Sequence, residues 1–420
     1  MAVSVQPVRG TRDYLPEEVR VRDAVNAIIL RSYENSGFSK IETPILEDIE
    51  RLDKSDGGEN LSMIFRILKR GQKLKLDKDE LSEKDLADMG LRFDLTLPLS
   101  RYYANNRANL RLPFKVIQIG QVFRAERPQK GRLRQFYQCD IDIIGDQTPE
   151  AEIELIHTTA KTLMKIGFDD FTVRVNDRRI LFDMIEQAGF PREDVLSVCI
   201  TFDKLDKIGI EGIEEELRGK GYNPEAIKKF IEAAGADRTA GVSIMSDFCS
   251  DQDVIGQLQY IIDSVEKLSE GRYRIEYDRS LVRGMGYYTG TIFEVVSPKF
   301  NSSIAGGGRY DKMIGNLIGE DVPAVGFSIG FERITEILLA DENMKFKHGV
   351  KRGALLYDKT DDFVNVMKKA DALREEGYDI SLLIKAKKLG KQLSSLENEG
   401  FDVALIFGQE EMKNLQQRQD

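Results

Sequence analysis

The side chains of this chain that could carry chemistry are those of arginine, aspartate, glutamate, glutamine and tyrosine. Only two histidines occur, His157 and His348, and the three cysteines, Cys139, Cys199 and Cys249, stand far apart. This distribution excludes an H-E-x-x-H metallohydrolase and argues against a disulfide framework, a thiolate zinc site or a C-x-x-C redox centre. A Ser-His-Asp triad is also disfavoured, because neither histidine lies near a candidate serine motif. We therefore expect chemistry that rests on charge and positioning.

Acidic residues alternate along a predicted strand, RQFYQCDIDIIG, at residues 134–145. Because successive side chains of a strand point to opposite faces, Gln138, Asp140 and Asp142 share one face with Phe136. The opposite face is apolar and is expected to lie in the core; it carries Tyr137, Cys139, Ile141 and Ile143. Unpaired carboxylates inside a sheet are costly, so the acidic face either meets solvent or lines a polar pocket.

A preceding strand, FKVIQIGQVFR at residues 114–124, leads into the exposed polar segment AERPQKGRL. Arg124 and Glu126 are predicted to share a face. The loop adds four further cations, Arg127, Lys130, Arg132 and Arg134. A basic hairpin loop is compatible with simple solvation and also with phosphate binding, to which the planar guanidinium is suited.

Two glycine-rich motifs and one arginine near a predicted helix start add further candidates. RGMGYYTG sets Arg283 close to Tyr287 and Tyr288, and IAGGGRYD at 304–311 forms either an anion-binding nest or a tight turn. In PAVGFSIGFERI, a strand runs into a helix whose first turn contains Arg333. A cation there opposes the helix dipole unless an anionic ligand or a nearby acid compensates it.

Length and composition limit the kind of protein that holds these residues. At 420 residues, 41% hydrophobic and 31% charged, the chain fits two or three globular domains. No apolar run approaches the roughly 20 residues that span a bilayer, and the start shows no signal pattern, so we expect no membrane association and a cytoplasmic location. Sixty-one basic against seventy-one acidic residues give a net charge of −10, so nucleic acid could bind only through local patches.

The predicted elements divide the chain into a β-rich core, a helical insertion and a tail. A helix is expected at 17–36, charged helical segments between about 176 and 270, and strand–helix alternation in the tail, which implies a parallel sheet. The tail has no G-x-G-x-x-G, so a dinucleotide site has no support. His157 falls in a predicted helix, where packing or surface exposure is expected. We predict a core at 1–172 and 273–342, a mostly α insertion at 173–272, and a C-terminal α/β domain at 350–420.

Several sequence runs, taken in order, make the chain resemble the histidyl-tRNA synthetases, a family of class II aminoacyl-tRNA synthetases. The runs are VRGTRDYLPEE, FSKIETPILE, LRFDLTLPLSRY, VFRAERPQKGRLRQFYQCDIDIIG, LVRGMGYYTGTIFE, IAGGGRYD and AVGFSIGFERI. The resemblance covers nearly the whole chain. It implies an α+β catalytic core on an antiparallel sheet, and a reaction in which histidine and ATP give histidyl-adenylate before the histidyl group passes to the 3′ end of histidine tRNA.

The resemblance also implies roles for the candidate residues. Arg124 would hold the ATP α-phosphate and the histidine carboxylate, Glu126 the adenine amino group, and Arg333 the distal phosphates, while Arg283 would stabilise the charge that develops at the α-phosphate. The histidine pocket would comprise Asp94, Thr96 and Gln138 at the α-amino group, and Asp142, Tyr288 and Tyr287 around the imidazole. No residue is assigned to a protein-bound metal; Mg²⁺ would arrive with ATP.

Partners follow from the same resemblance. The tail resembles the family's anticodon-binding domain, the loop residues Lys130, Arg132 and Arg134 would approach the acceptor stem of the tRNA, and the first motif implies a homodimer. Three departures stand out: Gly286 replaces a carboxylate, Asp94 and Asp142 replace the Glu of many bacterial members, and the chain stops soon after IFGQEEMKN, so the C-terminal domain is expected to be shorter than usual.

Two other functions are compatible with the same fold. The first is the histidine-sensing regulatory paralogue of histidine biosynthesis, which typically lacks the tail and degrades the arginine set. The second is an RNA-binding relative without catalysis. The presence of Arg124, Arg283, Arg333 and the tail favours the enzyme.

Overall fold

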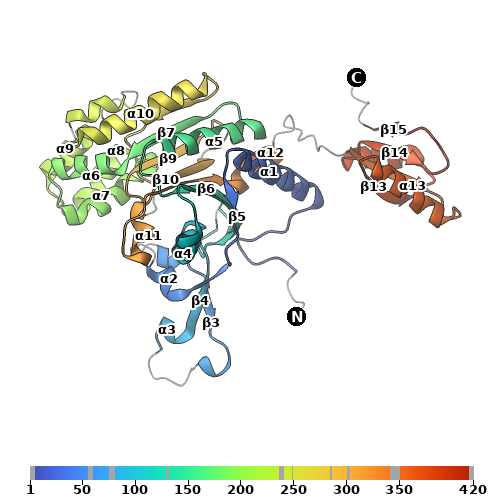
Figure 1. Ribbon diagram of the computed structural model, residues 1–420, viewed down its shortest axis with the longest axis horizontal. Coiled ribbons are helices and arrows are strands. Elements are labelled where there is room, and N and C mark those ends of the chain that lie inside the picture. Colours follow the sequence, from blue (N-terminus) through green and yellow to red (C-terminus); the bar gives the residue numbers. More distant parts are fainter. Residues whose placement is uncertain are drawn as a thin grey trace. The chain divides into compact units, whose positions relative to one another are not determined.

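The computed structural model of the chain divides into two compact units, residues 1–344 and 345–420 (Figure 1). It describes residues 5–54, 60–74, 81–128, 132–235, 241–247, 249–283, 286–299, 303–340 and 351–415.

An eight-stranded sheet forms the centre of the first unit. Its neighbouring strands run antiparallel except for the pairs β1·β5 and β7·β8, so the predicted antiparallel core is confirmed. In spatial order the strands are β1 (Ser39–Lys40), β5 (Phe114–Phe123), β6 (Gln135–Ile144), β11 (Ala324–Gly330), β10 (Ala305–Arg309), β9 (Thr291–Val296), β7 (Thr172–Asp177) and β8 (Arg274–Tyr277).

Helices bury one face of this sheet. The helix α1 (Pro16–Asn35) contacts α5 (Glu150–Ile166) and α12 (Phe331–Ala340); α5 packs on strands β6 and β11, and α12 packs on β6 (Figure 1). Beneath them the side chains of Cys139, Ile141 and Ile143 have exposed fractions of 0%, 0% and 1%. The predicted apolar face of β6 is therefore confirmed, and its polar face points to the other side of the sheet. There α4 (Thr96–Asn106), followed by η3 (Arg107–Asn109), packs on α11 (Asp311–Ile318).

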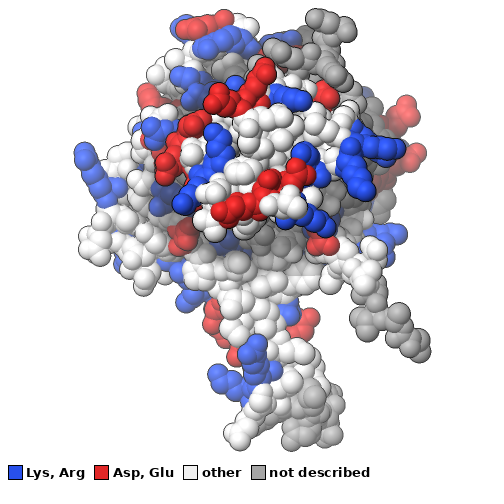
Figure 2. All heavy atoms as spheres, turned by 90° about the vertical axis from the view of Figure 1, so that its right-hand side faces the viewer, with Lys and Arg blue, Asp and Glu red and all other residues white. Residues whose placement is uncertain are grey.

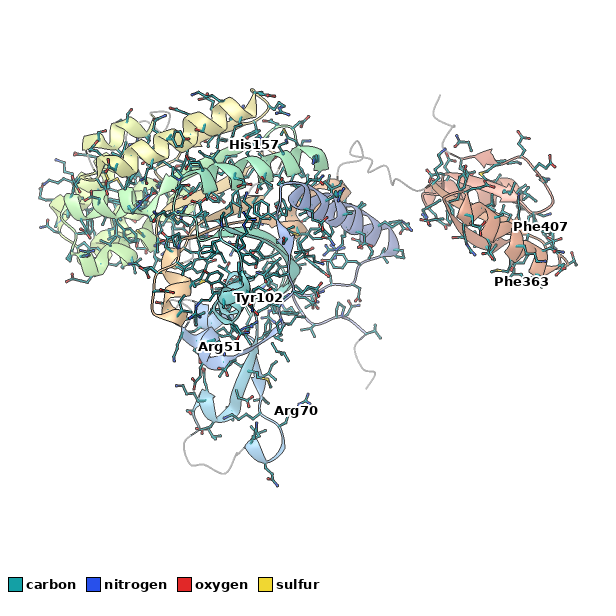
Figure 3. The ribbon with its side chains drawn as sticks, in the orientation of Figure 1. Arg51, Arg70, Tyr102, His157, Phe363 and Phe407 are labelled. Carbon is teal, nitrogen blue, oxygen red and sulfur yellow. The ribbon has the colours of Figure 1, made fainter. Side chains whose placement is uncertain are left out.

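A small three-stranded antiparallel sheet projects from the first unit (Figure 1). It consists of β2 (Leu46–Asp48), β4 (Ala87–Leu91) and β3 (Arg66–Leu68), with the short helices α2 (Ile49–Lys54), η1 (Asn60–Met63), η2 (Gly71–Lys73) and α3 (Glu83–Leu86) around it. Figure 3 labels Arg51 and Arg70 in this part of the chain. Its strands leave Leu46, Leu68 and Met89 exposed.

A helical segment lies between β7 and β8 in the sequence. It contains α6 (Arg178–Ala188), η4 (Arg192–Asp194), α7 (Val195–Phe202), α8 (Leu205–Gly219), α9 (Pro224–Gly235), η5 (Val242–Asp247) and α10 (Gln252–Ser269). Edge-to-face contacts of Phe230 with Phe190 and Phe202 give it an aromatic core. Because β7 pairs with β9 in the central sheet, the helices begin only at Arg178.

The second unit is a four-stranded sheet in the order β13-β12-β14-β15. The strands β12 (Lys351–Tyr357), β13 (Tyr378–Ile384) and β14 (Val403–Ile406) are parallel, as predicted, and β15 (Lys413–Asn414) is antiparallel. Helices α13 (Phe363–Glu375) and α14 (Leu389–Asn398) supply two separate apolar clusters, one around Val366 and one around Leu396. Figure 3 labels Phe363 and Phe407 here. On the side of the molecule shown in Figure 2, basic and acidic side chains of the described residues are interspersed.

Candidate active site

A cavity of about 1010 Å³ opens over the polar face of the central sheet. Its walls come from segments far apart in the sequence: the start of α4, the residues after β5, strand β6, residues 283 and 287–288, and β10, β11 and α12. The site residues predicted from the sequence that line it are Asp94, Thr96, Arg124, Glu126, Arg132, Gln138, Asp142, Arg283, Tyr287, Tyr288 and Arg333. The fold thus brings eleven of the thirteen candidates to one cavity.

The other two candidates stand elsewhere. Lys130 lies outside the described residues. Arg134 donates from Nε to the carbonyl oxygen of Glu126 at 3.0 Å, and its backbone nitrogen donates to the carbonyl of Gly10 at 2.7 Å. A further bond from its guanidinium to the carbonyl oxygen of Arg9, at 3.4 Å, helps to hold the N-terminal segment within the protein.

Two glycines make room for the charged side chains at the floor. A Cβ atom built on Gly326 of β11 would lie 2.0 Å from Asp142 Oδ1, and one built on Gly306 of β10 would lie 2.6 Å from the guanidinium carbon of Arg283. The glycine run of IAGGGRYD forms strand β10 rather than either of the expected conformations, an anion-binding nest or a tight turn. The local pattern could not predict this strand, because the side chains that require glycine here are distant in sequence.

Three arginines line one side of the cavity and are held by neighbouring groups. Arg124 donates from Nε to the carbonyl oxygen of Phe93 at 3.0 Å and lies over the ring of Phe136. Arg333, in the first turn of α12 as predicted, donates to the carbonyl and hydroxyl oxygens of Ser303. Arg283 lies 3.7 Å from Glu294, has a positive φ of 59°, and has a buried Nε without a hydrogen-bond partner in the described ranges.

The cationic side chains repel one another. Burial, together with Arg132, Arg283 and Arg124, lowers the pKa of Arg333. Glu294 partly offsets this effect, but no ion pair of Arg333 is formed within the described residues. An anion between these guanidinium groups would relieve the repulsion and accept hydrogen bonds from them.

The adjoining side of the cavity is acidic and more deeply buried. Asp94, Asp140 and Asp142 have exposed fractions of only 2%, 5% and 3%. Burial raises the pKa of Asp94 to about 6 and that of Asp140 to about 7, and it raises the pKa of Asp142 well above its ordinary value. The acidic face of β6 therefore lines a polar pocket and is not a solvated surface.

Hydrogen bonds give the acidic groups fixed directions. Asp94 Oδ1 accepts from the backbone nitrogen of Leu97 at 3.1 Å, which leaves Oδ2 buried and unpaired within the part of the chain described. Tyr310 donates its hydroxyl proton to Asp142 Oδ1 at 2.6 Å. Gln138 Oε1 is a second buried acceptor with no partner among the described atoms. Unpaired buried acceptors that face a cavity are suited to a ligand that brings N–H donors.

The paired tyrosines stand between the two sides. The rings of Tyr287 and Tyr288 lie 4.8 Å apart, and Tyr287 meets Tyr310 edge-to-face at 6.1 Å. The hydroxyl of Tyr287 lies near Thr96 and that of Tyr288 near Arg283, while burial raises both pKa values. Neutral phenols in these positions can donate or accept.

Several residues of this region were not assigned from the sequence. Asp140 was placed on the polar face of β6 but received no role, although the alternation of side chains indicated it. Tyr310 lies within IAGGGRYD, but nothing local indicated its bond to Asp142. Asp203 and Lys207, at the α7–α8 junction, also line the cavity, and no motif pointed to them.

The remaining features lie outside the cavity's chemistry. His157 on α5 places Nδ1 3.2 Å from the hydroxyl of Tyr273, which fits the expected packing role (Figure 3). Within the described ranges, no cluster of three or more His, Cys, Asp or Glu residues could hold a metal ion. A search of the same ranges finds no helix with the length and apolarity needed to traverse a bilayer.

The chain thus combines an antiparallel core, in which arginines and buried acids share one cavity, with a parallel α/β unit, and its relatives show it to be an aminoacyl-tRNA ligase. Residues 10–334 match the family model described as histidyl-tRNA synthetase, and the chain belongs to this family. The histidine–tRNA ligase of Leifsonia xyli is 41% identical over 401 residues, covering 93% of this chain and 92% of that protein. The enzyme of the same name from Aeropyrum pernix is 39% identical over 337 residues, 79% of this chain and 73% of its own.

Solved structures agree with this assignment. The crystal structure of histidyl-tRNA synthetase from Nostoc sp. PCC 7120 has a TM-score of 0.78 and 26% identity, and it covers 99% of this chain and 96% of its own. A Bacillus halodurans protein described as an ATP phosphoribosyltransferase regulatory subunit/histidyl-tRNA synthetase has a TM-score of 0.76 at 18% identity, covering 97% and 99%. The second likeness shows that the fold is shared.

Proposed function

We propose that the two sides of this cavity perform the two parts of histidine activation, with ATP on the arginine side and histidine on the acidic side. The chain would join histidine to AMP and then transfer the histidyl group to the 3′ end of histidine tRNA. The observation that supports this most directly is that one cavity is lined both by mutually repelling guanidinium groups and by residues with unpaired buried acceptors, Asp94 and Gln138.

On the arginine side, Arg124 binds the α-phosphate and the histidine carboxylate, and Arg333 binds the β- and γ-phosphates. Glu126 accepts a hydrogen bond from the adenine amino group. A carboxylate oxygen of histidine attacks the α-phosphorus in line, the bond to the bridging oxygen breaks, and pyrophosphate leaves. Arg283, held over Gly306, stabilises the negative charge that develops on the α-phosphate. The rate enhancement rests on positioning and fixed charge.

On the acidic side, Asp94 Oδ2 and Gln138 Oε1 accept hydrogen bonds from the α-ammonium group, assisted by Thr96. Asp142, oriented by Tyr310, and Tyr288 bind the two imidazole nitrogens, with Tyr287 alongside. A site built to satisfy a substrate's hydrogen bonds rejects analogues that lack them by about 10⁴- to 10⁵-fold, so no editing step is needed.

The larger partners belong to the same proposal. We assign the second unit, 345–420, to the anticodon region of the tRNA, and Arg132 to the acceptor stem. A homodimer would cover the exposed apolar side chains of the β2-β4-β3 sheet, Leu46, Leu68 and Met89. Mg²⁺ enters as the ATP complex, and the substrates place the reaction in the cytoplasm.

Histidine-dependent exchange between ATP and pyrophosphate tests the proposal without tRNA. We expect exchange that saturates with histidine and is absent with other amino acids. Well-folded protein that binds histidine but gives no exchange would favour the histidine-sensing regulatory function instead. A subsequent assay with histidine tRNA tests the transfer step.

A further inference from the structure

Asp140 lies between two groups assigned to the substrate, yet the proposed mechanism gives it no task. On β6 it stands two residues from both Gln138 and Asp142, and its register partners are Gln118 on β5 and Ser328 on β11. It lines the cavity and is 5% exposed. Burial of a third carboxylate beside two others costs folding free energy, so we expect Asp140 to have a function.

The contacts of Asp140 determine which way the amide of Gln138 faces. Gln138 Nε2 lies 3.5 and 3.4 Å from the two carboxylate oxygens of Asp140. An ionised carboxylate can only accept hydrogen bonds, so the amide must present its nitrogen there, since its oxygen would meet a negative oxygen. The orientation of Gln138 therefore follows from the charge of Asp140.

Ser328 supports the same orientation. Its hydroxyl lies close enough to Asp140 to lower the pKa of that carboxyl. Gln138 Nε2 donates to Ser328 Oγ at 3.4 Å, which leaves the hydroxyl proton free to turn toward the ionised Asp140. Both neighbours thus favour the amide nitrogen, and Gln138 Oε1 is left as a buried acceptor without a partner among the described residues.

We propose that Asp140 is a positioning residue whose ionised form holds the Gln138 carbonyl oxygen toward the substrate's ammonium group, so that protonation of Asp140 weakens histidine binding. The inference rests on the proposed function of the cavity. A protonated Asp140 can donate a hydrogen bond, and it then tolerates the reversed amide, which would point N–H groups at the ammonium. The ATP side does not depend on this amide.

The surroundings set the pH at which this occurs. The groups that interact electrostatically with Asp140 include two carboxyls, two guanidinium groups and three phenols: Asp94, Asp142, Arg92, Arg124, Tyr287, Tyr288 and Tyr310. Burial and Asp94 raise the pKa of Asp140 to about 7, against the lowering effects of Ser328 and Arg124. Histidine binding should therefore weaken as the pH falls through neutrality.

The test compares Asp140→Asn with wild type in histidine-dependent pyrophosphate exchange from pH 6 to 8.5. Asparagine is always neutral and can present either end to Gln138. We expect the KM for histidine at pH 8 to rise roughly 10-fold, as for a misdirected buried hydrogen bond, with the KM for ATP unchanged within about two-fold. The imidazole of the substrate titrates in the assays of both proteins. A weakening of histidine binding at low pH that occurs only in the wild type is therefore due to Asp140.

Ser328→Ala provides a second variant that keeps the carboxylate. Removal of the hydroxyl should move the inflection in the plot of the KM for histidine against pH to a higher pH than in the wild type, without abolishing it. If Asp140→Asn keeps both the wild-type KM and the wild-type pH profile, or if Ser328→Ala leaves the inflection unmoved, the inference is wrong. Absence of any exchange by the wild-type enzyme would instead refute the proposed function, so the two failures are distinguishable.

Discussion

The arginine side and the acidic side of the cavity differ in the sign of their charge and in how deeply their side chains are buried. The side chains of Arg283 and Glu294 keep about a fifth of their surface exposed, 22% and 23%, whereas Asp94 and Asp142 are almost fully buried. The arginines stay charged and repel one another, while the carboxyls have raised pKa values. A highly charged triphosphate is thus matched by permanent charges near solvent, and a small amino acid by titratable groups inside the sheet.

The largest expected effect comes from the arginine side. Arg283→Ala should slow adenylate formation by about 10²- to 10³-fold, as found when other fixed electrostatic stabilisers are removed. Pre-steady-state adenylation measures this step directly. Arg218→Ala is the matched control, because Arg218 forms an exposed ion pair with Glu214 on α8, and it should retain its rate within about two-fold. Wild-type adenylation by Arg283→Ala would remove Arg283 from the mechanism.

A crossed pair of substitutions sharpens the comparison between the two sides. Asp94→Asn keeps an acceptor for Leu97 but loses the charge that faces the ammonium group, so we expect the KM for histidine to rise about 10- to 100-fold. Arg333→Ala should raise the KM for ATP by a similar factor. In each variant the KM for the other substrate should stay within a few-fold. Steady-state exchange with one substrate varied at a time measures all four values, and equal effects of each change on both substrates would contradict the division.

The smallest expected effect concerns stability. The pKa of Asp94 is raised to about 6 in the folded protein, so the folded state favours the protonated form. The contribution of Asp94 to the free energy of unfolding is fully present below its unfolded pKa, about 3.9, and is lost as pH rises through the folded pKa. Asp94→Asn should therefore raise Tm by about 2–4 °C at pH 8 and by less at pH 5. A scan of Tm against pH for both proteins checks this, and a lower Tm at pH 8 would show that ionised Asp94 is stabilising.

The local sequence pattern was sufficient to predict the helices and strands and to predict which face of a strand is buried. The alternation along 136–143 predicted both the buried apolar face with Ile141 and the polar face with Asp142, because strand geometry has a fixed period. The strand–helix order of the tail likewise predicted the parallel sheet. The roles of Arg124 and Arg333 came from resemblance, and the structure brings these side chains to one cavity.

Contacts between distant segments could not be predicted in this way. The bond from Tyr310 to Asp142 joins residues 168 positions apart, and nothing in either segment specifies it. Arg134 belongs to a basic loop that suggested an external partner, yet its backbone and side chain are occupied by Gly10 and Glu126. The depth of Asp140 also depends on strands β5 and β11, which cover it from either side in the sheet.

The two glycines of the cavity floor, Gly306 and Gly326, limit how this ligase could be engineered to attach amino acids with unnatural imidazole rings to tRNA. A larger residue at Gly326 or Gly306 would displace the carboxyl of Asp142 or the guanidinium of Arg283, and either shift would move a functional group of the site. Mutant libraries should instead concentrate on the aromatic wall, above all Tyr287, where shape can change without displacing a charge.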